Sequence, residues 1–380
     1  MRHWGAALLR RCAFAVAGLI LLYGLAALAR GLERRDGVDK RLRVVLFVNG
    51  TLGDKSFYDS AARGMRQAGR SLPVVARVIE GGNDPTRWES ALTELADSGD
   101  YDLIVTGTFA MVPYVQTLAD EFPAAHFLVF DAAVDYTRCR CSNVHSMLFR
   151  QNEGAYLAGY LAAGLMRGGL PGAPAGSALG VIGGMQFLVI EDFIVGFRAG
   201  ADAAVPGITV YAQYANAFSD PAAGKDIARS QYQRGAGLIF HAAGATGQGV
   251  NEAAVDAQRY AIGVDMDQYA LYRTSNPARA ARIVTSVLKN VDAGIYRAIR
   301  QRLDGRLVFG RAESLGLAEG GVGLARDSAV LNQAPAALLC DLDARQAAIV
   351  SGRIKVPSAF AEPDFAPAPA ALSAPIPTAR

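Results

Sequence analysis

The sequence predicts an α/β fold made of two lobes, each a doubly wound sheet of largely parallel strands. Between residues 42 and 357, short runs rich in β-branched residues alternate with stretches of helical length, which is the pattern of βαβ units. The chain has 380 residues, of which 51% are hydrophobic. That is enough for two cores, and most single domains stop growing at about 250 residues. A cleft between two lobes is therefore expected.

The expected strands are short apolar runs, and the expected helices lie between them. The strands are 44–48, 74–79, 103–106, 127–131, 144–148, 178–182, 209–214, 238–241 and 260–264. The stretches of helical length are 58–69, 85–98, 113–121, 153–166, 189–203, 221–234 and 249–257. One long helical segment is expected over 279–302, and a strand-rich part follows it.

The order of these segments sets the expected domain boundaries. Residues 42–150 with about 268–303 are assigned to lobe I, and residues 151–267 with about 304–357 to lobe II. The tail 358–380 is rich in Pro and Ala. It is expected to be disordered, because proline supports neither helices nor sheet ladders.

The N-terminal stretch, 1–30, has the pattern of an export signal. Basic residues precede an apolar run, 12–29, that ends in Ala-Leu-Ala. We expect export to a periplasm or cell envelope, with cleavage after Ala29 favoured over retention of the run as an N-terminal anchor. Cys12 stands at the start of the apolar run and not after it, so it is not placed to be the lipid-attachment cysteine of a bacterial lipoprotein.

Charge and cysteine content argue against several classes of protein. The net charge is only +3 and the basic residues are scattered, so nucleic-acid binding is not expected. Cys139 and Cys141 are too close in sequence for an easy mutual bridge; one of them could pair with Cys340, and the sequence does not fix the pairing. Cys-x-Cys with only His126 and His145 nearby lacks zinc-site spacing, so no metal is expected.

No catalytic motif can be named in this chain. It has no Ser-centred nucleophile elbow, no His-Glu-x-x-His and no assembled triad, and it has four histidines, one of them in the signal region. The glycine-rich turn 242–249 lacks the Lys-Ser/Thr pair of a phosphate-binding loop. We therefore expect a protein that is not an enzyme and carries no cofactor.

Candidate binding residues follow the expected strands, because ligands of open α/β sheets bind at the carboxyl ends of strands. The loop 49–57 joins the first strand to a helix and ends in Phe57, whose ring could stack on a ligand or pack into the core. Asp131 follows another strand and could be a helix N-cap or a ligand contact.

The second half of the chain has further candidates. Phe218 stands just before a Ser-Asp-Pro helix start, and Gly244 lies in a turn where a ligand could approach bare backbone. Asp265 follows the last expected strand and could accept hydrogen bonds from paired hydroxyls. Lys289 lies in the expected helix 279–302, where a Lys that extends its ammonium to solvent is the default interpretation.

Several motifs occur together in a fixed order. They are Gly53-Asp54-Lys55-Ser56-Phe57, Glu153-Gly154-Ala155-Tyr156-Leu157-Ala158-Gly159-Tyr160, Ile182-Gly183-Gly184-Met185, Phe218-Ser219-Asp220-Pro221, the turn 242–249, and Gly263-Val264-Asp265-x-Asp267-Gln268. Over roughly 42–357 the chain thereby resembles the basic membrane protein family of ABC-transporter substrate-binding proteins, which includes purine nucleoside receptor lipoproteins. The resemblance implies a type I periplasmic-binding-protein fold, with three crossovers between lobes that close by hinge motion.

The resemblance also implies a binding site. In nucleoside-binding members, two phenylalanines sandwich the base, while carboxylates and a lysine hold the ribose. Phe57 and Phe218 would be the two plates, and Asp265 and Lys289 would hold the ribose. The full set of implied ligand-binding residues is Asn49, Asp54, Phe57, Asp131, Phe218, Gly244, Asp265 and Lys289.

Asn49 is where this chain departs from the nucleoside receptors that it resembles. Purine-binding members carry an Asp that contacts the base at this strand end, and the loop to Phe57 is one residue shorter here. An Asn side chain offers both a donor and an acceptor, whereas an ionised Asp only accepts. The base preference, and binding of another aromatic or small polar ligand, therefore stay open.

The expected function is to capture a nucleoside, a purine nucleoside in the first place, and to deliver it to an ABC permease in the membrane. We expect a monomer. Two other functions stay open. One is a membrane-anchored sensor or regulatory receptor with the same lobes, and the other is a nucleoside-processing enzyme such as a hydrolase, against which the missing acid cluster argues.

Overall fold

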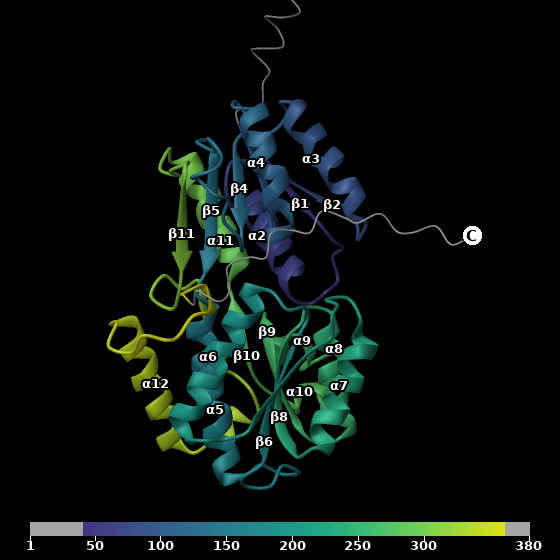
Figure 1. Ribbon diagram of the computed structural model, residues 1–380, viewed down its shortest axis with the longest axis vertical. Coiled ribbons are helices and arrows are strands. Elements are labelled where there is room, and N and C mark those ends of the chain that lie inside the picture. The colour runs from purple at the N-terminus through teal and green to yellow at the C-terminus, as the bar shows by residue number, and fades with distance from the viewer. Residues whose placement is uncertain (1–40, 362–380) are drawn as a thin grey trace, which may run out of the picture. The chain divides into compact units, whose positions relative to one another are not determined.

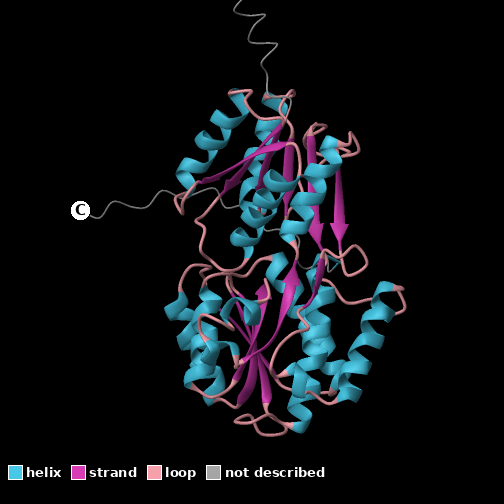
Figure 2. Cartoon of the chain, turned by 180° about the vertical axis from the view of Figure 1, so that it is seen from behind, coloured by secondary structure: helices cyan, strands magenta, loops and turns pink. Residues whose placement is uncertain are grey.

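The computed structural model describes residues 41–361 of the chain. Within this range the chain forms two six-stranded sheets with helices on both faces of each sheet (Figure 1, Figure 2). No helix among these residues is long and apolar enough to cross a membrane. The expected signal or anchor, 1–30, lies outside the described residues.

The first sheet has the strand order β11-β5-β4-β3-β1-β2, and every neighbouring pair is parallel. Its strands are β1 (Leu42–Val48), β2 (Val74–Glu80), β3 (Leu103–Gly107), β4 (Phe127–Phe130), β5 (Val144–Phe149) and β11 (Arg311–Leu315). Its helices are α2 (Phe57–Ser71), α3 (Trp88–Asp97), α4 (Val112–Glu121) and α11 (Val291–Leu303). Alternate residues of β1 face opposite sides, so α2 and α11 cover one face and α3 and α4 the other.

The second sheet has the order β12-β10-β9-β8-β6-β7 and is parallel except for β12, which is antiparallel to β10. Its strands are β6 (Ala178–Gly183), β7 (Val210–Tyr214), β8 (Ala236–Ala242), β9 (Tyr260–Asp265), β10 (Ile283–Lys289) and β12 (Val322–Leu324). Its helices are α5 (Gln151–Gly168), α6 (Leu188–Ala204), α7 (Pro221–Gln233), α8 (Thr246–Asp256), α9 (Gln268–Tyr272), α10 (Pro277–Ala280) and α12 (Ala336–Val350).

The chain passes between the sheets after β5, after β10 and after β11. β10 belongs to the second sheet, so the helix predicted over 279–302 is wrong over 283–289, whereas residues 291–302 do form a helix, α11. The assignment of 268–289 to lobe I is wrong as well. β10 lies between two strands and is buried along nearly its whole length, so it lacks the polar alternation of a half-exposed strand. β11 belongs to the first sheet, which corrects the assignment of its residues to lobe II; it is an exposed edge strand with little apolar signal.

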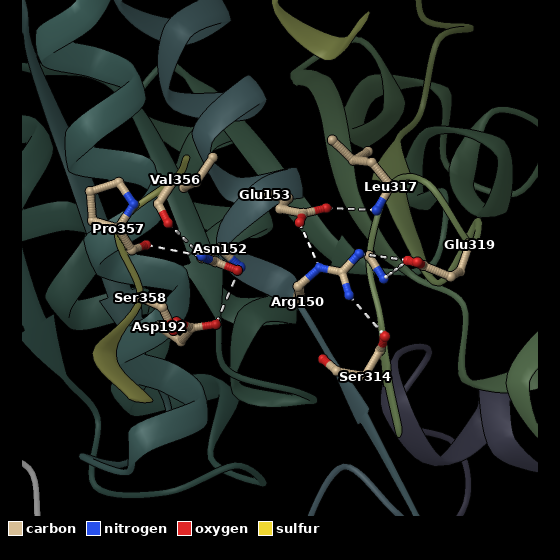
Figure 3. A network of polar contacts seen from close by, with 11 residues as sticks. Arg150, Asn152, Glu153, Asp192, Ser314, Leu317, Glu319, Val356, Pro357 and Ser358 are labelled. Atoms are coloured by element: carbon tan, nitrogen blue, oxygen red, sulfur yellow. Dashed lines mark hydrogen bonds and ion pairs between the residues drawn. The ribbon is translucent and has the colours of Figure 1, made fainter. Parts of the chain in front are cut away.

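Arg150 ties the first crossover to the third (Figure 3). Its guanidinium binds the carboxylates of Glu153 and Glu319, each with an N···O distance of 2.6 Å, and donates to the carbonyl of Ser314 at 2.8 Å. Glu153 also accepts the backbone N–H of Leu317 at 2.7 Å. These charge-assisted bonds fix where the chain leaves one lobe and enters the other.

The second crossover is bound to the third through Asn290. Its backbone N–H donates to the carbonyl of Gly321, and its side-chain amide donates to the carbonyl of Gly320, both at 2.8 Å. The three connections are therefore joined by hydrogen bonds, the first to the third and the second to the third.

The chain beyond α12 returns to the second lobe. The side chain of Asn152 donates to the carbonyls of Val356 and Pro357 at 3.3 and 3.0 Å, and Asp192 accepts the hydroxyl of Ser358 at 2.6 Å (Figure 3). The predicted start of a disordered tail at residue 358 is therefore wrong for 358–361, because buried polar groups hold this segment. The remainder of the predicted tail lies outside the described residues.

Cys139 and Cys141 form a disulfide with each other, and Cys340 is a free, exposed thiol. The idea that one of the pair bridges to Cys340 is therefore wrong. The backbone turns between the two bonded residues, with Cys141 at a positive φ of 25°, and this brings their Cα atoms to 5.2 Å. Two cysteines separated by one residue are poorly placed for a mutual disulfide only when the backbone between them is extended.

Helices α5 and α6 pack with their backbones in direct contact, and glycines make this possible. A Cβ on Gly159 would overlap the carbonyl oxygen of Phe197, and one on Gly200 would overlap that of Tyr156. Only a hydrogen atom fits at these two positions, so the glycines set the distance between the helices that cover this face of the second sheet.

Replacing Gly200 by Ala should lower the free energy of unfolding by about 2 kcal/mol or more, because a methyl group forced against fixed backbone is a costly form of overpacking. Gly168→Ala is the matched control. It lies at the end of α5, where a Cβ would have no neighbour within 4 Å, and Ala favours the helix by about 1 kcal/mol. Urea denaturation followed by circular dichroism measures both; equal stability of Gly200→Ala and wild type would contradict the close contact.

Candidate functional site

Buried polar side chains from both sheets come together at the carboxyl ends of the strands. Asn49 follows β1, Asp131 follows β4, Asp265 ends β9 and Lys289 ends β10; each is 8% exposed or less. The rule that ligand sites lie at carboxyl strand ends therefore applies to both sheets at once.

Lys289 and Asp131 form an ion pair between the two sheets. The Lys289 ammonium also lies 5.5 to 5.6 Å from the ring centroids of Phe57, Phe149 and Phe193. Burial raises the pKa of Asp131, and the ammonium opposes that rise. The default interpretation of Lys289 as a surface lysine is wrong, because a lysine that is 1% exposed needs a charged partner and finds it here.

Asp265 is linked to the first lobe by Ser56, whose hydroxyl donates to its carboxylate. Burial raises the pKa of Asp265 to about 7; Lys289 and Ser56 oppose this rise, while the carboxylates of Asp54 and Asp131 add to it. Near neutral pH this group is therefore divided between a carboxylic acid, which can donate, and a carboxylate, which accepts only.

Asn49 is held by two neighbours on the first lobe. Its Oδ1 accepts the hydroxyl of Tyr58 at 3.2 Å, and its Nδ2 donates to the hydroxyl of Thr108 at 3.1 Å. Burial raises the pKa of Tyr58, so this side chain stays a donor. The amide is thus fixed in orientation with one N–H of Nδ2 left over for a further acceptor.

The loop before α2 positions Phe57, the first residue of that helix. The carboxylate of Asp54 accepts the backbone N–H groups of Ser56, Tyr58 and Asp59 at 2.9 to 3.1 Å, and so caps the helix. Burial raises the pKa of Asp54 despite these bonds. Asp54 thereby orients the residues next to it, and its direct contact with a ligand stays a prediction.

The ring of Phe57 is half-buried and rests against other aromatic rings. Its centroid lies 5.4 Å from that of Phe130 and 5.3 Å from that of Tyr58. One part of the ring therefore packs into the core of the first lobe, while the remainder stays accessible.

Phe218 and Gly244 contact each other on the second lobe. A Cβ on Gly244, which has a φ of 55°, would lie 3.2 Å from the carbonyl oxygen of Phe218. The ring of Phe218 lies directly over Gly184 and is 36% exposed. Among the hydrogen bonds, ion pairs and ring contacts of residues 41–361, none joins Phe218 or Gly244 to the group around Lys289.

The start of α8 connects the neighbourhood of Phe218 with the first lobe. The N–H of Thr246 donates to the carbonyl of Phe218 at 3.1 Å. Two residues further on, the side chain of Gln248 donates to the carbonyl of Asp54 at 3.2 Å. The two loops that carry the predicted aromatic plates are therefore adjacent to the same turn of helix.

Sequence reasoning missed several residues that shape this site. Ser56 precedes Phe57 within the motif 53–57, and Tyr58 directly follows that motif. Phe149 directly follows the predicted strand 144–148, so the strand-end rule could have found it. Phe193 has no local signal, because it lies within α6 and reaches the site only through tertiary packing. A further contact between the lobes pairs Phe109 with Phe187, whose ring centroids are 3.9 Å apart.

The site offers binding groups and no recognisable catalytic set. His241, next to the glycine-rich turn, is buried and bonded to Asn251 at 3.2 Å, and burial lowers its pKa to about 4, so its imidazole is neutral at physiological pH. Within residues 41–361, no group of three or more His, Cys, Asp or Glu side chains is placed to hold a metal ion.

Two α/β lobes whose strand ends meet at buried charges and aromatic rings define a solute-binding protein with the type I periplasmic-binding-protein fold. Comparison with known sequences agrees. The chain belongs to the PnrA-like family of ABC transporter substrate-binding proteins, whose family model matches residues 41–359. Substrate-binding proteins of ABC transporters are exported.

Three similar proteins illustrate this membership. Basic membrane protein D of Borreliella burgdorferi strain JD1 is 31% identical over 292 residues, which cover 76% of this chain and 80% of that protein. The ABC transporter nucleoside-binding protein BmpA of Lactococcus lactis subsp. cremoris is 29% identical over 364 residues, 91% and 97% of the two chains. The crystal structure of an ABC transporter solute-binding protein from Aeropyrum pernix K1 has a TM-score of 0.72 at 27% identity, covering 85% and 95%.

The ligand-free protein should lose stability as the pH rises from about 4 to about 7, in part through Asp265. Its pKa of about 7 in the folded protein exceeds the ordinary value of 3.8, so the folded state binds the extra proton in this window. The free energy of unfolding falls across this window, because the unfolded chain has lost the proton that the folded protein still holds, and it levels off above pH 7. Asp265→Asn should remove this component and should exceed wild type in stability at about pH 8.

Urea denaturation at a series of pH values measures this effect. Asp84→Asn is the control, because hydrogen bonds from Thr86 lower the pKa of Asp84 and its contribution has the opposite sign. A stability difference between wild type and Asp265→Asn that stays constant from about pH 4 to pH 8 would contradict the assignment.

Proposed function

We propose that this protein captures a nucleoside, a purine nucleoside in the first place, and delivers it to an ABC permease. The observation that carries the proposal is the position of the Phe57 ring, 5.5 Å from the Lys289 ammonium, beside the buried carboxylates of Asp131 and Asp265. A nucleoside has matching parts, because its base is flat and aromatic and its sugar carries several hydroxyls.

In the proposed complex the base stacks on the accessible part of Phe57. Stacking on an aromatic side chain suits a purine and does not depend on its hydrogen-bonding edge. Phe218 is the proposed second plate, since its ring is 36% exposed and its loop adjoins the turn of α8 that contacts the loop of Phe57. Asn49 offers its remaining N–H to an acceptor on the base.

The sugar is proposed to bind at Asp265 and Lys289. An ionised carboxylate can accept two hydroxyls, and Ser56 already demonstrates that a hydroxyl reaches Asp265. Lys289 contributes a charged donor whose position is fixed by Asp131. A hydroxyl-rich ligand would thus replace water around groups that are costly to bury without partners.

The proposal includes the absence of chemistry at this site. The relative from Lactococcus lactis is named as a nucleoside-binding protein of an ABC transporter, which supports ligand capture. Binding and release of an unchanged nucleoside require only the closing and opening of the lobes about the bonded crossovers of Arg150 and Asn290.

Replacing Phe57 or Phe218 by Ala should weaken nucleoside binding by about 1–3 kcal/mol, which is the usual effect of losing one stacking partner of a base. Titration calorimetry with adenosine, guanosine, inosine, uridine and cytidine measures it. Phe360→Ala is the control, because that ring is exposed in a segment held by other contacts. Absence of binding by every nucleoside and free base would refute the proposed function.

Nucleoside affinity should rise as the pH increases through about 7 and then level off. The pKa of Asp265 is about 7, and only its ionised form accepts both hydroxyls of a bound sugar. The Asp265→Asn variant should bind more weakly and lose this rise. Calorimetry from about pH 5.5 to pH 8.5 tests it, and an affinity in wild type that falls over that range would exclude the carboxylate as the acceptor.

A further inference from the structure

Gln151 is a buried amide without a partner. It is the first residue of α5 and is 1% exposed, and neither its Nε2 nor its Oε1 has a hydrogen-bond partner among residues 41–361. Buried polar atoms in native proteins are almost always paired, since an unpaired one loses its hydration without compensation. Gln231 differs, because its buried Nε2 donates to Val181 and Gln213 at 3.3 and 3.1 Å, and only its Oε1 has no partner among these residues.

The helix geometry places Gln151 beside the end of β10. Residues three apart lie on one face of a helix, so Gln151 shares a face with Gly154. A Cβ on Gly154 would lie 3.0 Å from Cγ1 of Val287, two residues before Lys289. The first residue of α5 and the last residue of β10 both adjoin a crossover between the lobes. Going back one turn along α5, from Gly154 to Gln151, therefore leads in the same direction as going forward along β10, from Val287 to Lys289.

The sequence neighbours of Gln151 point to the same place. Phe149, two residues earlier, lies 5.6 Å from the Lys289 ammonium. The N–H of Asn152, the next residue, donates to Asp192 at 3.3 Å, and Lys289 opposes the rise that burial causes in the pKa of Asp192. The residue after Asp192 is Phe193, another ring against the ammonium. These contacts place the start of α5, where Gln151 lies, next to the side chains that surround Lys289.

We propose that Gln151 binds the ligand directly, by hydrogen bonds to a sugar hydroxyl of the nucleoside beside Lys289. A hydroxyl both donates and accepts, and so does an amide, so the two satisfy each other. The proposal rests on the proposed function for the identity of the ligand. Gln151 would then discriminate against analogues that lack this hydroxyl, because without the hydroxyl the buried amide would have no partner.

A ligand-binding amide and a structural amide respond to mutation in opposite ways. If Gln151 is unpaired until ligand binds, Gln151→Leu removes a penalty from the ligand-free protein and should raise its urea midpoint. The same change in Gln231 breaks existing bonds and should lower the midpoint. Gln231→Leu is thus the matched control, and Gln151→Met is a second variant in case the branched side chain fails to fit.

The experiment uses the full chain and two measurements. Urea denaturation without ligand compares wild type, Gln151→Leu, Gln151→Met and Gln231→Leu. Calorimetry then measures adenosine or inosine and their 2′-, 3′- and 5′-deoxy analogues. Gln151→Leu should lower the affinity for the parent nucleoside by about tenfold, which is the effect of losing one or two hydrogen bonds. Gln231→Leu should leave this affinity unchanged. For one of the deoxy analogues, the loss of affinity seen in wild type should disappear in Gln151→Leu.

The outcomes separate this proposal from the function on which it rests. One outcome is that wild type binds nucleosides and that each deoxy analogue loses the same affinity in Gln151→Leu as in wild type. That outcome would overturn the role of Gln151 and leave the proposed function intact. Absence of any nucleoside binding by wild type would overturn both the proposed function and the contact with a nucleoside sugar. A lowered urea midpoint in both Gln151 variants would assign the amide a structural role and overturn the proposal by itself.

Discussion

The ion pair between Lys289 and Asp131 is the interaction on which the arrangement of the candidate site depends. Each partner comes from a different sheet, and the lysine is almost completely buried. Removing one partner of such a pair typically costs about 3–5 kcal/mol, because the other charge is left without compensation. The pair therefore holds the strand ends of the two lobes together, orders the rings of Phe57 and Phe193 around the ammonium, and moderates the pKa of Asp265.

The fold was largely predictable wherever strand and helix patterns are local. Alternating apolar runs placed β1 to β9 within a few residues, and the rule on strand ends then located Asn49, Asp131 and Asp265. Two strands escaped for opposite reasons. β10 is buried along nearly its whole length and its sequence resembles a continuation of the helical segment, whereas β11 is mostly exposed and polar and carries little apolar signal.

The site was predictable only in part, because much of it is assembled by packing between distant segments. Lys289 was identified by resemblance and given the wrong local structure, since its strand was missed. Gln151 and Phe193 occupy ordinary helix positions, and nothing in the neighbouring sequence distinguishes them from core residues. The disulfide between Cys139 and Cys141 depends on a left-handed backbone turn that pair spacing does not reveal.

Both sheets receive an edge strand from the last fifth of the chain. β11 pairs with β5 across more than 160 residues, as in the pairing of Arg311 with His145, and β12 pairs with β10 only after the chain has returned from the first lobe. Residues of α11 also complete the core on one face of the first sheet. Neither lobe can finish folding until synthesis has passed residue 324, and such long-range pairing is slow to form. A chain that matures this late stays unfolded longer, which suits a protein class that crosses a membrane before it acts.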